Sequence, residues 1–516
     1  MTFLPLLGPV ALLFAALTLY LKPAQRAHWS LRLPEWAALW AVGVAVAGGA
    51  ALWAWGPTSS PVIGLEWAGL SVRTDIVSVA MASTVSFVGW IVLRFSRNAL
   101  DGEARHCNFM VGMSLTLAFV LLLVTAGNLV QLVLAWVAVG VGLHRLLLFY
   151  PDRPQAQRAA KKKTVSGLIG SSALVLAAGL LINGYGTADI ASISAAAQAG
   201  ETPGTVWLVA LLLAIAAVFK SALVPTHGWL TEVMEAPTPV SALLHAGVVN
   251  AGGFLLIRFA DVLLAAPGVL ALLALIGGFS ALVGAAVALT QSSVKTALAW
   301  STCAQMGFMV LQCGLALFPL ALLHIVAHSL YKAHAFLASG GAVEQVASIR
   351  RPGPVAVPGL RAVTKAFAIA LTIYLVIGAG FVMWEKPMQA IALGAILIFG
   401  VAYLIAQGLA DAAPLELTWR TALLSGAATV AYFGFQTLAT ALSAGTLPPP
   451  PAPDGLIWAV IALAVAGFGL AAVAQATFPL WAGHPAAAGL RVHLMNGLYL
   501  NAMTDRMTGR WTPKKG

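Results

Sequence analysis

Long apolar runs recur along the whole 516-residue chain and are separated by short polar segments. Most runs hold about 18–25 residues, enough for a helix to cross a hydrocarbon core of ~30 Å. They show no period-two alternation, so the pattern predicts helices and not barrel strands. We predict an all-α polytopic membrane protein with about 13–15 transmembrane helices, near residues 3–21, 36–56, 74–94, 108–126, 129–150, 164–184, 206–224, 238–260, 265–290, 299–318, 320–340, 364–384, 387–408, 421–441 and 456–479.

Basic residues are distributed unevenly between the polar loops. The second, fourth and sixth loops together hold only Arg73, whereas the first, third, fifth and eleventh are rich in Arg and Lys. This bias marks the cytoplasmic side, so we predict a multi-pass protein of the bacterial inner membrane with a periplasmic N-terminus. The basic loop residues are Lys22, Arg26, Arg32, Arg94, Arg97, Arg105, Arg153, Arg158, Lys161, Lys162, Lys163, Arg350, Arg351 and Arg361.

Composition excludes several other classes of protein. Hydrophobic residues make up 60% of the chain and charged residues only 9%, far from the roughly 25% charged residues of soluble domains. The net charge of +11 follows from the loop bias, so we expect no nucleic-acid partner. Three cysteines without ligand spacing argue against bound metal or iron–sulfur clusters in this chain. No basic residue precedes the first span, so we interpret it as a retained helix and not a cleaved signal.

Lys220 is the most informative charged residue because it ends an apolar run. A charge at the bilayer centre costs about 2.5–3.5 kcal/mol, so it marks a functional position. Five residues later Pro225 has no N–H to donate, so the helix is predicted to break beside Lys220. Broken helices at membrane depth line polar cavities, where a buried lysine can load and release a proton. The alternative is that Lys220 extends its amino group to the membrane interface.

His245 follows in the next predicted helix. Pro237 and Pro239 fit the first turn of that helix, and His245 lies about 9 Å further along its axis. Histidine changes charge near neutral pH, so we interpret His245 as a proton relay beside Lys220. A hydrogen-bonded structural histidine is the alternative.

A second group of basic residues begins at Lys295. His324, His328 and Lys332 are spaced by four residues, which places them on one face over ~12 Å of helix. We interpret this face as a hydrated proton path. The alternatives are a purely structural role and a zinc site, although the glutamate of an HExxH motif is absent.

The last residues differ from the membrane spans. Residues 486–510 mix apolar positions with Arg491, His493, Asn496, Asp505 and Arg506, which predicts a short amphipathic segment against membrane lipids at the cytoplasmic interface. A disordered tail is the alternative. We divide the chain into N-terminal transmembrane helices (1–107), a first half-channel repeat (108–260), a second half-channel repeat (265–408), C-terminal transmembrane helices (409–480) and a cytoplasmic tail (481–516).

These motifs together resemble a known family. The stretch KSALVPTHGWLTEVMEAPTPVSALLH (220–245), followed by VKTALAWSTCAQMGFM (294–309) and HIVAHSLYKAHAFLASG (324–340), resembles the proton-conducting membrane subunits of complex I and of Mrp antiporters. The resemblance covers roughly residues 70–345 and implies two inverted five-helix repeats with broken helices. It also implies a central proton-loading role for Lys220, a relay role for His245, further links at Lys295 and Lys332, and a bridge toward the second half-channel at His324 and His328.

The chain also departs from that family. Val137 stands where the family has a glutamate after tryptophan, so Lys220 needs another anionic partner, for which Glu232 and Glu235 are candidates. The second-half lysine is Lys386 at best, slightly out of register, and the long lateral helix is absent.

One branch of the superfamily shares such departures: the membrane subunits of DAB inorganic-carbon accumulation complexes, whose tail resembles residues 491–506. This resemblance implies a large, zinc-containing, carbonic-anhydrase-like cytoplasmic partner, DabA, with cation flow driving the conversion of CO2 to bicarbonate. The zinc would then lie on the partner, and this chain would be an energy-coupling transport subunit, not an enzyme. A proton-pumping subunit of a complex I-like respiratory complex and an Mrp-type cation/proton antiporter subunit are the alternatives.

Overall fold

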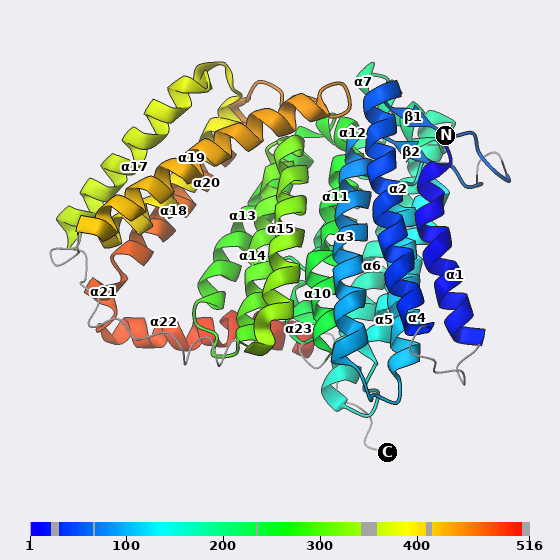
Figure 1. Cartoon of the computed structure of the whole chain (residues 1–516). Helices are drawn as coiled ribbons and strands as arrows, with labels where there is room; N and C mark the ends of the chain where they lie inside the picture. Colours follow the sequence, from blue (N-terminus) through cyan, green and yellow to red (C-terminus); the bar gives the residue numbers. More distant parts are fainter. Residues whose placement is uncertain are drawn as a thin grey trace.

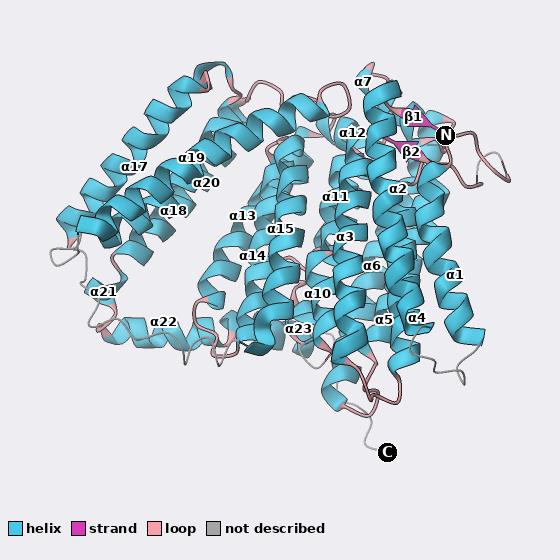
Figure 2. Cartoon of the chain, viewed as in Figure 1, coloured by secondary structure: helices cyan, strands magenta, loops and turns pink. Residues whose placement is uncertain are grey.

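Helices form almost all of the described chain. The computed structural model describes residues 2–21, 30–65, 68–233, 236–341, 359–408 and 415–507 (Figures 1 and 2). Within these residues, twelve helical segments are long and apolar enough to cross a membrane. The three other predicted spans form α8 (Val206–Lys220), α14 (Val294–Gly314) and α18 (Met388–Gly408). The predicted all-helical polytopic fold is therefore confirmed, whereas the inverted repeats and the domain boundaries stay predictions.

The first part of the chain is a bundle of long helices. Two strands of two residues each, β1 (Thr58–Ser59) and β2 (Arg73–Thr74), pair antiparallel and cover one end of this bundle. Side chains that accept the free N–H groups of the first turn fix where two of the helices begin: Asp75 caps α3 and Asn128 caps α5. The helices are α1 (Leu7–Leu21), α2 (Leu33–Trp55), α3 (Ile76–Ala99), α4 (His106–Val124), α5 (Leu129–Leu147) and α6 (Pro154–Tyr185).

One prediction about the loops is wrong. The basic residues Arg158, Lys161, Lys162 and Lys163 do not lie in a loop but in the first turns of α6, and Lys162 and Lys163 are buried. Pro154 in the first turn of α6 accounts for the early start, since proline is preorganised for that position.

The middle of the chain contains the predicted break. Helix α8 ends at Lys220, and after an irregular segment the chain continues through α9 (Gly228–Thr231) into α10 (Thr238–Ala246). A 3-10 turn at Val248–Asn250 separates α10 from α11 (Ala251–Arg258), so this span is interrupted once more. The remaining helices are α7 (Ile190–Gln198), α12 (Ala260–Leu264), α13 (Pro267–Ala288) and α15 (Phe318–Ala338).

Helices α13 and α14 pack closely through glycines. A Cβ atom at Gly277 would lie 2.4 Å from the backbone nitrogen of Leu311, and one at Gly307 would lie 2.5 Å from the nitrogen of Ala281. Small residues let membrane helices approach this closely, so that van der Waals contacts hold the pair together.

The C-terminal helices form a separate group beside the bundle. Helices α17 (Leu360–Gly380), α18, α19 (Leu415–Ser443) and α20 (Gly455–Ala476) pack on one another, and α20 contacts α13 while α19 contacts α15. Figure 1 shows α22 (Pro485–Met495) lying across the base of the molecule, after α21 (Phe478–Trp481) and before α23 (Leu500–Met507). The predicted amphipathic tail is thus helical over 485–507 apart from the turn at Gly497–Tyr499, and the disordered alternative is wrong there.

Candidate functional site

Lys220 ends α8 with its amino group over an aromatic ring. The Lys220 Nζ atom lies 4.4 Å from the ring centroid of Trp136 on α5, a geometry that stabilises a cation through the ring quadrupole. Trp136 is 2% exposed, whereas the side chain of the next residue, Val137, is 41% exposed. Among the described residues, no carboxylate forms an ion pair with Lys220. The sequence predicted an acidic partner for Lys220, but in the structure its ammonium group contacts the indole ring of Trp136.

The predicted partner Glu232 binds elsewhere. Its carboxylate accepts from Lys162 Nζ at 2.6 Å and lies 3.3 Å from Arg158 Nε, both on α6. Asn501 of α23 also donates to Glu232. The structure therefore corrects the prediction of Glu232 as the counterion of Lys220, because Glu232 pairs with two cations of α6 instead. The other candidate, Glu235, lies outside the described residues.

These contacts join the tail to the broken helix. Asp505 of α23 forms ion pairs with both Arg158 and Lys162, the latter at 2.6 Å. We call the five residues of this network the tail cluster: Arg158, Lys162, Glu232, Asn501 and Asp505. The tail is thereby fixed to the segment that follows Lys220.

A second lysine approaches Lys220 from α6. Lys163 is 9% exposed, and its Nζ atom donates to the Gly140 carbonyl, one helical turn beyond Trp136 on α5. The sequence pattern places the three consecutive lysines in one predicted loop and so assigns no site role to Lys163. Adjacent residues point about 100° apart on a helix, so Lys161, Lys162 and Lys163 have different surroundings.

His245 and Lys332 lie together inside the bundle. The His245 ring is fully buried on α10 and stacks on Phe336 of α15, with centroids 4.3 Å apart. Lys332, also fully buried, donates to the Leu298 carbonyl at 3.1 Å and to the Ser301 hydroxyl. The charges of His245 and Lys332 act on one another. The structure thus brings together two of the predicted site residues.

His324 and His328 extend this group along α15. Their ring centroids are 6.1 Å apart, and buried His328 lies one helical turn from both His324 and Lys332 on α15. We call His245, His324, His328 and Lys332 the histidine–lysine cluster. Within the described part of the chain, no group of three His, Cys, Asp or Glu side chains is placed to hold a metal ion.

Several buried polar atoms near these residues have no partner in the protein. Both ring nitrogens of His227, His245 and His328 are unbonded, as is Nε2 of His324. A buried polar group left unsatisfied costs about 1–3 kcal/mol, so groups of this kind favour bound water or transferred protons as partners. Fully buried His227 lies after the break, with its ring 4.6 Å from Trp300. The motif at Pro225 contained His227, but its spacing gave it no role.

Two predicted residues lie outside these groups. Lys295 is in the first turn of α14 and is partly exposed. Lys386 follows the turn Met383–Glu385, where its Nζ atom donates to Thr437 Oγ1 at 3.2 Å. Burial lowers the pKa of Lys386. The structure does not bring Lys386 to the histidine–lysine cluster, since its described contacts are with α19.

A buried ion network lies at the hairpin end of the bundle. Asp75 is fully buried and is contacted by Arg258 at 2.5 Å and by Arg73 Nε at 2.8 Å. Burial by itself raises the pKa of Asp75, but the two guanidinium groups and the N–H of Ser78 outweigh it, so the pKa lies below its ordinary value. This network joins α3, α11 and β2.

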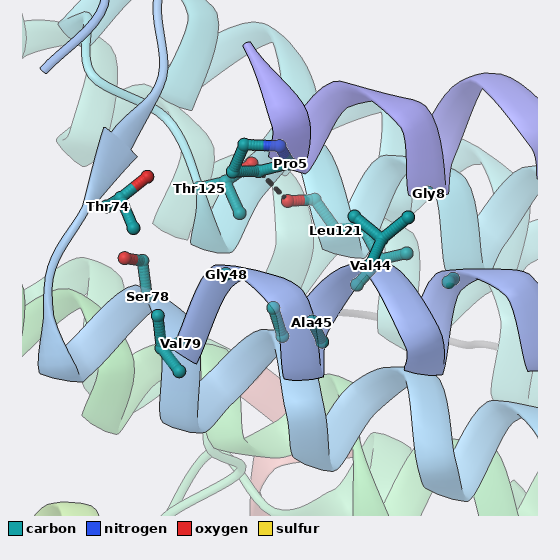
Figure 3. A pocket seen from close by; sticks show the side chains of 12 residues that line it. Pro5, Gly8, Val44, Ala45, Gly48, Thr74, Ser78, Val79, Leu121 and Thr125 are labelled. Carbon is teal, nitrogen blue, oxygen red and sulfur yellow. Dashed lines mark hydrogen bonds between the residues drawn. The ribbon is translucent and has the colours of Figure 1, made fainter. Parts of the chain in front are cut away.

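A small pocket opens between α1, α2, α3 and α4 near the same end (Figure 3). Its walls are mainly small and apolar, with hydroxyl groups only from Thr74, Ser78 and Thr125, and it contains no titratable side chain. The pocket therefore has no groups for proton transfer.

Comparison with known proteins agrees with this arrangement. Residues 126–410 match the family described as NADH:quinone oxidoreductase/Mrp antiporter, TM. The fold is also similar to a chain of the Mrp complex from Dietzia sp. DQ12-45-1b, with a TM-score of 0.58 and 25% identity over 98% of this chain and 57% of that one. The chain therefore belongs to this family of membrane subunits.

Two curated relatives narrow the family further. A probable inorganic carbon transporter subunit DabB2 from Halothiobacillus neapolitanus is 37% identical over 88% of this chain and 82% of the relative. A probable inorganic carbon transporter subunit DabB from Hydrogenovibrio crunogenus is 40% identical, but the match spans about half of each protein, 54% of this chain and 55% of the relative. Within its family the chain thus belongs with the DabB subunits, which makes it a cation-conducting, transporter-type membrane subunit.

Proposed function

We propose that the chain conducts protons through Lys220 and the histidine–lysine cluster and couples their flow to bicarbonate accumulation. The CO2 hydration itself takes place on a separate zinc-containing, carbonic-anhydrase-like subunit of the DabA type. The relatives named as inorganic carbon transporter subunits support this assignment.

The observation that carries the proposal is the set of buried imidazole nitrogens without a hydrogen-bond partner, in the same group as the fully buried Lys332. Ionisable groups within membrane spans are expensive and mark ion pathways. Neutral imidazole both donates and accepts a proton near neutral pH. His328 and Lys332 lie one turn apart on α15, and His245 stacks on Phe336 of the same helix, so a proton added to one of these groups changes the proton affinity of the others.

The path would begin at Lys220, where α8 breaks, and continue to the histidine–lysine cluster. We place the tail cluster in the cytoplasm and the N-terminus in the periplasm of a bacterial inner membrane, because the basic helix ends and the tail share one side. The partner would then dock on that side, close to α22 and α23.

The partner is tested by purifying the tagged chain in mild detergent and measuring the mass and zinc content of the proteins that accompany it. We expect one large soluble protein that contains zinc. Quinone-binding and iron–sulfur subunits, or several small membrane subunits, would instead assign the chain to a respiratory complex or an Mrp-type antiporter.

The path is tested with Lys220→Ala in liposomes that contain the purified complex. We expect loss of coupled proton uptake with unchanged membrane insertion, because the substitution removes a charge and not a packing core. Lys365→Ala is the control, since Lys365 is an exposed lysine of α17. Wild-type proton uptake by the Lys220 variant contradicts the proposal, and sodium-dependent uptake without pH change identifies Na⁺ as the driving ion.

A further inference from the structure

One face of α5 is contacted by two lysines from different helices. Lys220 of α8 places its amino group on the Trp136 ring, and Lys163 of α6 donates to the Gly140 carbonyl. Trp136 and Gly140 are four residues apart, so they lie one above the other on the helix, about 6 Å apart. The charges of the two lysines act on one another.

We propose that Lys163 is a second proton-carrying residue of this path and acts as the like-charged partner of Lys220. The inference rests on the proposed proton conduction and adds a residue that neither the sequence motifs nor the comparisons single out.

The surroundings of Lys163 differ from those of its neighbours in the lysine run. Lys161 is exposed, and Lys162 forms ion pairs with Glu232 and Asp505. Lys163 is buried, and its described hydrogen bond goes to one neutral carbonyl. An ammonium group has three donors, and a buried charge without a counterion is unfavourable. Lys163 is therefore placed to give up its proton, whereas Lys162 has two carboxylate partners.

Two ammonium groups on one face of α5, one turn apart along the helix, disfavour double protonation. A proton that arrives on Lys163 therefore promotes release of the proton on Lys220. In this step one N–H bond forms at Lys163 with a proton from the aqueous side, and one N–H bond breaks at Lys220, whose proton passes to water in the proposed path; no electron is transferred. Repulsion from Lys163 would thus control the proton affinity of Lys220, a role that attraction to the carboxylate has in a lysine–carboxylate pair.

Other charged groups face Lys163 from the elements around it. His144 is the nearest on α5, since its Nδ1 atom lies 3.1 Å from the hydroxyl of Thr164 and the charge of Lys163 acts on it. Further described titratable groups on the elements packed around α6 are Arg145 on α5, Lys220 on α8, His227 and Glu232 beside α9, Arg158, Lys161 and Lys162 on α6 itself, and Asp505 on α23. The charged members of the tail cluster, Arg158, Lys162, Glu232 and Asp505, form ion pairs with one another. A change at Lys163 therefore acts mainly on Lys220 and His144.

The test compares Lys163→Gln, Lys163→Arg and the control Lys161→Gln in the complete complex, reconstituted in liposomes, with proton uptake measured from pH 6 to pH 9. We expect wild-type uptake from the control. Both Lys163 variants should lose at least about ten-fold in rate, since neither side chain releases a proton in this range. Lys163→Arg keeps the positive charge and a donor for Gly140, so its thermal stability should match the wild type.

In Lys163→Gln the residual uptake should extend about one pH unit further into the alkaline range, because Lys220 has lost a repelling charge. The same shift should persist in the double variant with His144→Gln. If Lys163→Arg keeps the wild-type rate and pH profile while Lys220→Ala is inactive, the proposed role of Lys163 is refuted but the proton path through Lys220 is not. Unchanged uptake in both Lys163→Arg and Lys220→Ala would overturn the proposed proton path as well.

Discussion

The buried ion network at Asp75 offers a prediction whose size follows from its contacts. Asp75→Asn keeps the helix cap, because an asparagine oxygen still accepts from the Ser78 N–H, which is 2.8 Å from the aspartate oxygen. It removes the negative charge that Arg258 and Arg73 share. Removing one partner of a buried ion pair costs about 3–5 kcal/mol, and Asp75→Ala should cost roughly 1 kcal/mol more through the lost cap.

The measurement is thermal unfolding in detergent, followed by tryptophan fluorescence. We expect Asp75→Asn to lower Tm by about 5 °C or more, because a large domain loses roughly 2 °C for each kcal/mol. Glu416→Gln is the matched control: its ion pair with Arg420 is 3.5 Å long, with both side chains more than 70% exposed. Exposed pairs contribute little, so Tm of the control should not change.

The same network predicts a dependence on pH. The pKa of Asp75 lies below its ordinary value of 3.8 in the folded protein. A lowered pKa gives stability that is complete above the unfolded-state pKa and is lost as the pH falls through the folded-state pKa. The Tm difference between wild type and Asp75→Asn should thus be constant from pH 7 to about pH 5 and narrow below pH 4. Equal Tm values at pH 7 would refute the reasoning.

Two further predictions concern the tail and the packing of α13 on α14. Asp505→Asn leaves Lys162 and Arg158 without one carboxylate, so hydrogen exchange should become faster in α23 but not in α20; unchanged exchange in α23 would show that the ion pairs do not hold the tail. Gly277→Leu would force its side chain into the backbone of α14 and should cost on the order of 1–3 kcal/mol or more in thermal stability. Gly278→Leu is the control, because the nearest atom to a Cβ there is a side-chain carbon at 4.0 Å.

The tail cluster gives the C-terminal helices a defined place in this architecture. Figure 1 shows α22 running along the base of the molecule from α21 toward α13, and α23 then reaches α6. Glu232, the residue that follows α9, is bound by both α6 and α23. A subunit that moves the tail would therefore act on the segment that follows Lys220, which is where proton entry is proposed.

The sequence by itself determined the class of protein and its helices. Apolar runs of membrane-spanning length located the spans, because a helix is the open-chain structure that satisfies its own backbone hydrogen bonds in lipid. Pro225 located the break after Lys220, since proline removes a helical hydrogen bond whatever surrounds it. The four-residue spacing placed His324, His328 and Lys332 on one face. All these features depend on local covalent structure or on residues close in sequence.

Only the tertiary structure decided which residues meet. Glu232 was expected near Lys220 because the two are close in sequence, but a tail residue more than 250 positions away and two α6 cations hold it instead. Trp136 and Lys163 approach Lys220 from α5 and α6, and the hydrophobic pattern of each helix does not predict how the helices pack on one another. The partners of a buried charge depend on how helices distant in sequence are oriented against one another, and a single sequence contains no direct record of that orientation.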